Sequence, residues 1–277
     1  MLAIIFLSAL LSLVLPAGHG ALSTAEDFTL LRQLKHDRAS FTQGLVHYNG
    51  FIYESAGLYG RSSLRMIDPT NWKVVKKVRL ADRFFAEGIA IANDRVYMLT
   101  YHEKTMLVFS ADSLELIQQF RFQTVTGEGW GLTTDGEFLI ASDGSQVLTV
   151  YMMPTQSMSA SDQLTKVKEI PVRDRESGRY LHNINELQYV DGFIYANIWF
   201  QDYIVKINYA TGIVEEKYDM STLYPRHLRG PKVDCFNGIA YNSSDGSFLV
   251  TGKLWPLYYH VRLRDKSTSR MNLELRP

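Results

Sequence analysis

The chain reads FTQGLVHYNGFIYESA at residues 41–56, and the fold prediction starts from this stretch. It opens with a polar residue, a glycine and an aliphatic residue, QGL at 43–45. An Asn-Gly turn at 49–50 leads into an alternating apolar segment. Period-two alternation on both sides of such a turn is the sequence signal of a β-hairpin. The stretch therefore predicts two antiparallel strands.

The same short motif occurs five times along the chain. Each copy has a polar residue or tryptophan, then glycine or glutamate, then an aliphatic residue. The copies begin at Gln43, Glu87, Trp130, Asn185 and Asn237, at intervals of 43 to 55 residues. Intervals of this size are typical of the blades of a β-propeller.

Further strand-like segments follow every copy of the motif. Apolar second segments lie at residues 51–53, 95–99, 138–140, 193–195 and 248–250. Third segments lie at 63–67, 105–109, 147–151, 203–207 and 258–262. A more charged fourth segment comes next, as at 74–80. Four strands in five units predict an all-β fold, a five-bladed β-propeller. A β-sandwich or β-helix is the alternative, but a sandwich gives no reason for a motif that recurs five times.

Two features indicate how the ring closes and what covers it. Residues 28–34 resemble a fourth strand and precede the first copy of the motif, so we expect them to join the last blade. The connections at 173–183 and 219–236 are longer than hairpin loops. Long loops in compact domains are usually functional, and we expect these two to cover one end of the central channel.

The charge composition limits the classes of function. Lys plus Arg and Asp plus Glu both total 29, with no basic block, so the sequence does not indicate nucleic-acid binding.

The apolar run at 2–16, followed by small residues, predicts a signal peptide over 1–20. We expect secreted or periplasmic localisation without stable membrane insertion, because this run is too short to span a bilayer. The single cysteine, Cys235, excludes an intrachain disulfide. Residues 21–277 are predicted to form one domain, and we expect a monomer.

A propeller brings its innermost strands together around the axis, so the motif residues are expected to meet there. Second-strand ends add Trp199 and the segment at 251–255. The expected set contains the carboxyl of Glu87, several amides, the ammonium of Lys253 and aromatic rings. A carboxyl group among such rings is poorly solvated, which raises its pKa toward the range useful for proton transfer. The set suits acyl transfer from an amide, which needs a proton donor and oxyanion stabilisation.

Several of these segments resemble the motifs of the plant and bacterial glutamine cyclotransferases. They are residues 41–45, 57–65, 127–132, 142–145 and 251–255, and the similarity extends from about Phe41 to about Tyr259. The resemblance implies a five-bladed propeller that closes N-terminal glutamine of peptides or proteins into pyroglutamate and releases ammonia. We expect no cofactor and no catalytic metal. The seven histidines show no pair at metal-ligand spacing.

The resemblance also implies a role for each candidate residue. Glu87 would carry a proton from the side of the substrate amine to the departing ammonia. Gln43, Asn185 and Lys253 would hold the substrate amide and amine and stabilise the oxyanion. The aromatic pocket would consist of Phe41, Phe85, Tyr101, Trp130 and Trp199. Tyr101 departs from the family pattern, which usually has tryptophan there. The alternative function is a non-catalytic propeller that binds peptides or a protein partner at its channel mouth.

Overall fold

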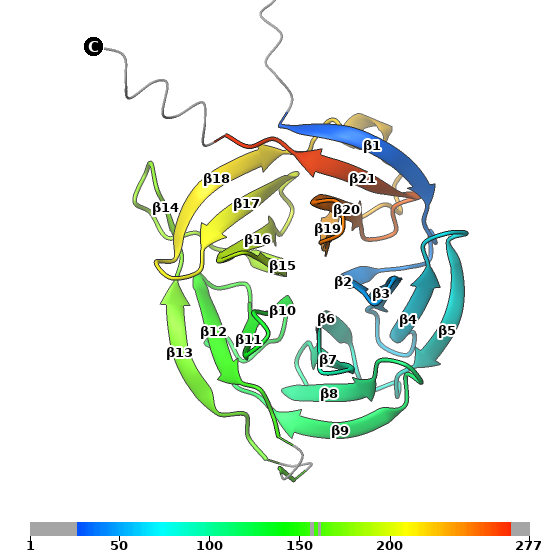
Figure 1. Cartoon of the computed structure of the whole chain (residues 1–277), viewed down its shortest axis with the longest axis vertical. Coiled ribbons are helices and arrows are strands. Elements are labelled where there is room, and N and C mark those ends of the chain that lie inside the picture. Colours follow the sequence, from blue (N-terminus) through cyan, green and yellow to red (C-terminus); the bar gives the residue numbers. More distant parts are fainter. Residues whose placement is uncertain (1–26, 156–157, 160–161, 267–277) are drawn as a thin grey trace, which may run out of the picture.

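The computed structural model describes residues 27–155, 158–159 and 162–266, in which five β-sheets stand around a central axis (Figure 1). The predicted five-bladed β-propeller is confirmed. The predicted signal peptide lies outside the described residues. In the described part, no helix has the length and apolar character needed to cross a membrane.

Blades 1 to 3 are antiparallel four-stranded meanders. Blade 1 contains β2 (Thr42–Tyr48), β3 (Phe51–Ala56), β4 (Ser63–Asp68) and β5 (Lys73–Arg79). Blade 2 contains β6 (Ala86–Ala92), β7 (Arg95–Thr100), β8 (Thr105–Ser110) and β9 (Leu116–Arg121). Blade 3 contains β10 (Leu132–Thr134), β11 (Phe138–Ala141), β12 (Val147–Met152) and β13 (Lys166–Pro171). In each blade the first strand lies at the axis and the last at the rim (Figure 1).

Blade 4 has a fifth strand at its outer edge. It contains β14 (Arg173–Asp174), β15 (Ile184–Val190), β16 (Phe193–Ile198), β17 (Tyr203–Asn208) and β18 (Ile213–Asp219). The short strand β14 pairs in parallel with β18 and lies outside the ring (Figure 1). The expectation that the whole 173–183 connection covers the channel is therefore wrong, because its first residues complete the sheet edge instead.

Blade 5 closes the ring with strands from both ends of the described chain. It contains β1 (Phe28–Lys35), β19 (Phe236–Asn242), β20 (Ser247–Gly252) and β21 (Leu257–Leu263). The outermost strand β1 pairs antiparallel with β21, as the sequence predicted. The connection between β18 and β19 carries the 3-10 helix η1 (Arg226–Leu228).

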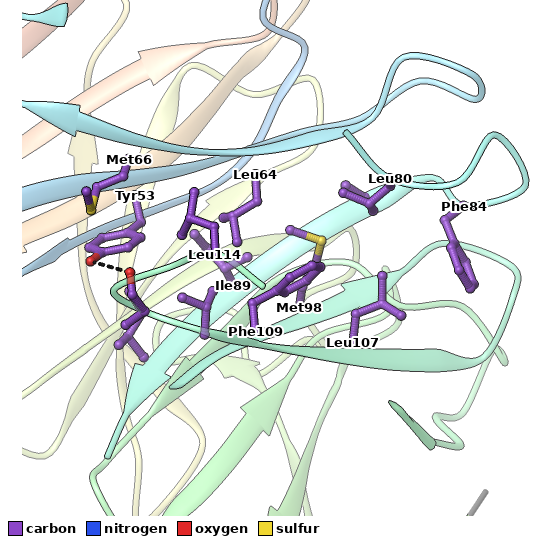
Figure 2. Packing of buried hydrophobic residues seen from close by; sticks show 14 residues of the cluster. Tyr53, Leu64, Met66, Leu80, Phe84, Ile89, Met98, Leu107, Phe109 and Leu114 are labelled. Atoms are coloured by element: carbon purple, nitrogen blue, oxygen red, sulfur yellow. Dashed lines mark hydrogen bonds between the residues drawn. The ribbon is translucent and has the colours of Figure 1, made fainter. Parts of the chain in front are cut away.

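The hydrophobic core is divided among the spaces between neighbouring blades. In the cluster between blades 1 and 2, Tyr53 and Leu64 face Ile89, Met98 and Leu107 (Figure 2). Four comparable clusters fill the other spaces within the described residues. Because each blade packs on two neighbours, the inner strands are held at fixed positions around the axis.

Candidate functional site

The nine residues to which the resemblance assigns a role line one cavity of about 180 Å³. They are Phe41, Gln43, Phe85, Glu87, Tyr101, Trp130, Asn185, Trp199 and Lys253. Phe200 and Asp234 complete the lining. The residues come from all five blades, so only the closed ring assembles them.

A β-bulge positions the polar motif residues in four of the five inner strands. The strand register shifts where Gln43, Glu87 and Asn185 lie, and again at Asn237. A bulge breaks the alternation of a strand and redirects a side chain. In blade 3, β10 begins only after the motif, at Leu132. The motif found in the sequence is therefore the place where each inner strand departs from regular pairing.

The glycine after the polar residue allows neighbouring inner strands to approach closely. A Cβ on Gly131 would lie 2.0 Å from the Asn185 carbonyl oxygen, and one on Gly88 would lie 2.4 Å from the Leu132 nitrogen. Blade 4 carries Glu186 at this position. Its buried carboxylate accepts a hydrogen bond from the Leu45 backbone N–H at 2.9 Å. Glu186 thus reaches from blade 4 to blade 1, and the pKa of its carboxyl is raised well above the usual value by burial.

Two residues expected at the site have structural positions instead. Asn237 is fully buried and does not line the cavity, because its Nδ2 donates to the carbonyl oxygens of Thr42 and Gln43 at 3.0 and 3.2 Å. Trp255 is also fully buried, and its indole N–H donates to the Asp234 carbonyl at 2.9 Å. Both residues hold the chain segments that carry cavity residues.

Glu87 is the buried carboxyl group of the cavity, with 4% of its surface exposed. The Gln43 side-chain Nε2 donates to Glu87 Oε1 at 3.0 Å. Burial raises the pKa of Glu87 well above its ordinary value. Lys253 opposes this shift, while the carboxylates of Glu128 and Glu103 reinforce it. The environment therefore favours the neutral, proton-carrying form of Glu87.

Lys253 places a buried cation in the same cavity. Only 5% of its surface is exposed, and its Nζ lies 5.0 Å from the centre of the Phe41 ring. Within the described residues, its ammonium makes no hydrogen bond and has no carboxylate oxygen within 4.0 Å. A buried ammonium without an anionic partner is costly. The arrangement is suited to an anion, or to an oxygen that becomes negative during a reaction.

Aromatic rings form the walls around these polar groups. Phe85 contacts Phe41 and Tyr101, with ring centroids 6.2 and 5.6 Å apart. Trp130 and Trp199 meet edge to face at 5.4 Å. The Trp130 indole donates to the Glu128 carboxylate at 2.8 Å. The rings keep solvent from Glu87 and Lys253. Tyr101 supplies one of these rings, as the resemblance predicted.

Phe200 and Asp234 were not predicted from the sequence. Phe200 has a backbone φ of 59°, a left-handed conformation that is uncommon for a large residue. This turn allows Trp199 and Phe200 to line the cavity although they are neighbours in the chain. Asp234 belongs to the 219–236 connection, which the sequence did associate with the channel. Its position just before the fifth motif was the available signal.

A buried ionic network fixes the segment that carries Phe41 and Gln43. Glu54 on β3 is fully buried, and its carboxylate accepts hydrogen bonds from Ser40 at 2.7 Å and Thr42 at 2.6 Å. His36 contributes Nε2, 2.9 Å from the same carboxylate, and its Nδ1 donates to the Trp255 carbonyl at 2.7 Å. The network therefore joins blade 1 to the loop after β20, on which Lys253 lies.

We expect Glu54→Gln to lower the free energy of unfolding at pH 7 by about 3 kcal/mol. Burial tends to raise the pKa of Glu54, but His36 and Arg65 outweigh it and lower the pKa to about 2 from 4.5. A depressed carboxyl pKa stabilises the fold above the unfolded-state value, and this stabilisation is lost as the pH falls from about 4.5 to about 2. The difference between variant and wild type should therefore shrink in that range.

Urea unfolding at pH 7 and at pH 3 measures this difference, with the exposed Glu115→Gln as the matched control. Equal stability of wild type and Glu54→Gln at pH 7 would show that the network contributes nothing.

The described residues contain no group of three or more His, Cys, Asp or Glu side chains placed to hold a metal ion. Cys235 is buried next to Asp234, and burial raises the pKa of its thiol to about 11. A thiol in this state is a poor nucleophile. The ionisable and polar side chains that the cavity itself presents are carboxyl, amide, phenol and ammonium groups.

Three comparisons with known proteins each give a match that covers most of the chain. The sequence profile of the glutamine cyclotransferase family matches residues 5–263. A glutaminyl-peptide cyclotransferase of Arabidopsis thaliana is 33% identical over 252 residues, which cover 89% of this chain and 74% of that protein. The crystal structure of Myxococcus xanthus glutaminyl cyclase superposes with a TM-score of 0.74 at 31% identity. That match covers 86% of this chain and 97% of the Myxococcus chain.

Proposed function

Because the chain belongs to the glutamine cyclotransferase family, we propose that it converts the N-terminal glutamine of peptides and proteins into pyroglutamate and releases ammonia. The observation that carries this proposal is the buried carboxyl of Glu87, which accepts a hydrogen bond from Gln43, in a cavity that also holds the buried ammonium of Lys253. An intramolecular attack on an amide needs a proton donor for the leaving nitrogen and a positive group for the oxyanion.

In the proposed reaction, the α-amine of the substrate attacks the carbonyl carbon of its own side-chain amide. A carbon–nitrogen bond forms to close the five-membered lactam, and the bond to the amide nitrogen breaks. Glu87 gives its proton to the departing nitrogen and receives one from the attacking amine, so the enzyme returns to its starting state. Substrate and products balance as glutaminyl peptide to pyroglutamyl peptide plus ammonia.

The other polar groups supply binding and charge stabilisation in this proposal. The Lys253 ammonium faces the developing oxyanion, with the side-chain amide of Asn185 as a further donor. The buried Gln43 Oε1 has no hydrogen-bond partner within the described residues, which leaves it free to accept from the substrate amide NH₂. The aromatic walls exclude water and strengthen these electrostatic interactions.

We further propose that the enzyme works as a secreted or periplasmic monomer without a metal or cofactor. The N-terminal apolar run supports export. Glu87 and Lys253 together supply the proton transfer and the positive charge that a metal-bound water or a Lewis acid would otherwise provide.

Ammonia release from a Gln-Phe dipeptide tests the activity directly. We expect turnover of this peptide and none of N-acetyl-Gln-Phe, whose amine is blocked. We also expect none of Asn-Phe, because its cyclisation would require a strained four-membered ring. A folded protein that binds Gln-Phe but releases no ammonia would instead support the non-catalytic, peptide-binding alternative.

A further inference from the structure

Asp234 is a carboxylate in the cavity lining to which the proposed chemistry assigns no task. It lies in the connection between β18 and β19 and is half-buried. Its backbone N–H donates to the Lys253 carbonyl at 3.1 Å, so the two residues lie side by side at the cavity. The cavity therefore presents a carboxylate and an ammonium from adjacent chain segments.

The Asp234 carboxylate is held in a fixed position. Its Oδ1 accepts a hydrogen bond from the Cys235 backbone N–H at 2.5 Å, and its carbonyl accepts from the Trp255 indole at 2.9 Å. The Trp255 ring fits only beside a glycine, because a Cβ on Gly252 would lie 2.2 Å from the ring. Residues 252–255 thus support Asp234 as well as placing Lys253.

The same carboxylate has unused capacity to bind a cation. Across residues 27–155, 158–159 and 162–266, no Lys, Arg or His nitrogen lies within 4.0 Å of it, and its hydrogen bonds come from the backbone N–H and the thiol of Cys235. A carboxylate next to aromatic surface suits an organic ammonium, which has both a charge and an apolar body. In the proposed function the carboxamide of a bound glutamine lies between Glu87 and Lys253, and the α-amine adjoins Glu87 to give up one proton. The remaining N–H groups of that amine are left for another acceptor of the cavity lining, and Asp234 is such an acceptor.

We propose that Asp234 binds the α-amino group of the N-terminal glutamine and thereby selects peptides with a free N-terminus. This inference rests on the proposed function. Asp234 accepts a hydrogen bond from the amine and takes no proton from it, since the proton leaves through Glu87. Pyroglutamate has a neutral lactam nitrogen in place of the amine, so the charged contact is lost on cyclisation. Asp234 therefore favours the substrate over the product.

Binding measurements on the full chain can isolate this contact. A Glu87→Gln background prevents turnover, and calorimetry then compares a Gln-Phe-Ala tripeptide with its analogue that lacks only the α-amine. With Asp234 intact, we expect the amine to improve affinity by about tenfold to a hundredfold, as hydrogen bonds to charged groups do. In Asp234→Asn the improvement should fall below about threefold, and Asp234→Glu, which keeps the charge, should restore part of it.

Glu137→Gln is the control, because it removes a negative charge from an exposed side chain that does not line the cavity. The advantage of the amine should persist in this variant. If the amine improves affinity equally with Asp234 intact and in Asp234→Asn, the assignment of Asp234 is overturned while the proposed function stays intact. If neither peptide binds to the Glu87→Gln protein with Asp234 intact, the proposed function fails, and the role of Asp234 fails with it. Thermal unfolding of each variant shows that the comparison is made between folded proteins.

Discussion

Glu87→Gln is expected to lower kcat for cyclisation of N-terminal glutamine by about 10²- to 10⁴-fold, the usual contribution of general acid–base catalysis. The substitution keeps the size of the side chain and an oxygen that can accept from Gln43, but it removes the proton that the leaving nitrogen requires. Steady-state ammonia release from Gln-Phe measures the effect. The exposed Glu137→Gln serves as the control and should retain wild-type turnover.

The pH dependence gives an independent check on Glu87. The pKa of its carboxyl is raised, so the acid form persists above the ordinary range and its contribution is lost only as the pH rises through the raised pKa. The substrate amine, with an ordinary pKa of about 7.7 to 8.0, must lose its proton to attack. We therefore expect a bell-shaped profile of kcat/KM in wild type. Unchanged turnover in Glu87→Gln would remove this residue from the mechanism.

Lys253→Met is expected to lower kcat by about 10²- to 10³-fold, the usual effect of removing an oxyanion-stabilising group. Lys253 also lowers the pKa of Glu87, so its removal should raise that pKa further. The alkaline limb of the kcat/KM profile should then move to higher pH. A lysine that only filled space would produce neither the loss of kcat nor the shift of the limb.

Lys253→Met should be more stable than wild type, although it is less active. Lys253 is a buried ammonium without a carboxylate partner within the described residues. Replacing it with an apolar side chain of similar length removes a desolvation cost, and we expect the fold to gain about 1 kcal/mol. Urea unfolding measures the gain, with the exposed Lys77→Met on β5 as the control. A large loss of stability would contradict the assignment of Lys253 to function.

The motif that begins at Gln43 shows how far local sequence signals could predict the site. The repeat predicted both the blade count and the gathering of Gln43, Glu87, Trp130 and Asn185. The fifth copy was misleading, because Asn237 uses its amide to brace the backbone of blade 1. Recurrence of a motif identifies equivalent positions in a ring, but the side-chain contacts at each position differ.

The sequence by itself determined the architecture, because strand periodicity and a fivefold motif can be recognised in the chain without knowing which residues are in contact. It also determined which residue types face the axis. Only the tertiary structure decided that Phe200 and Asp234 join them. Their placement depends on a left-handed turn at Phe200 and on the indole of Trp255, which reaches the carbonyl of Asp234 21 residues away. Contacts of this kind depend on packing between distant segments, and no periodic pattern in the chain records them.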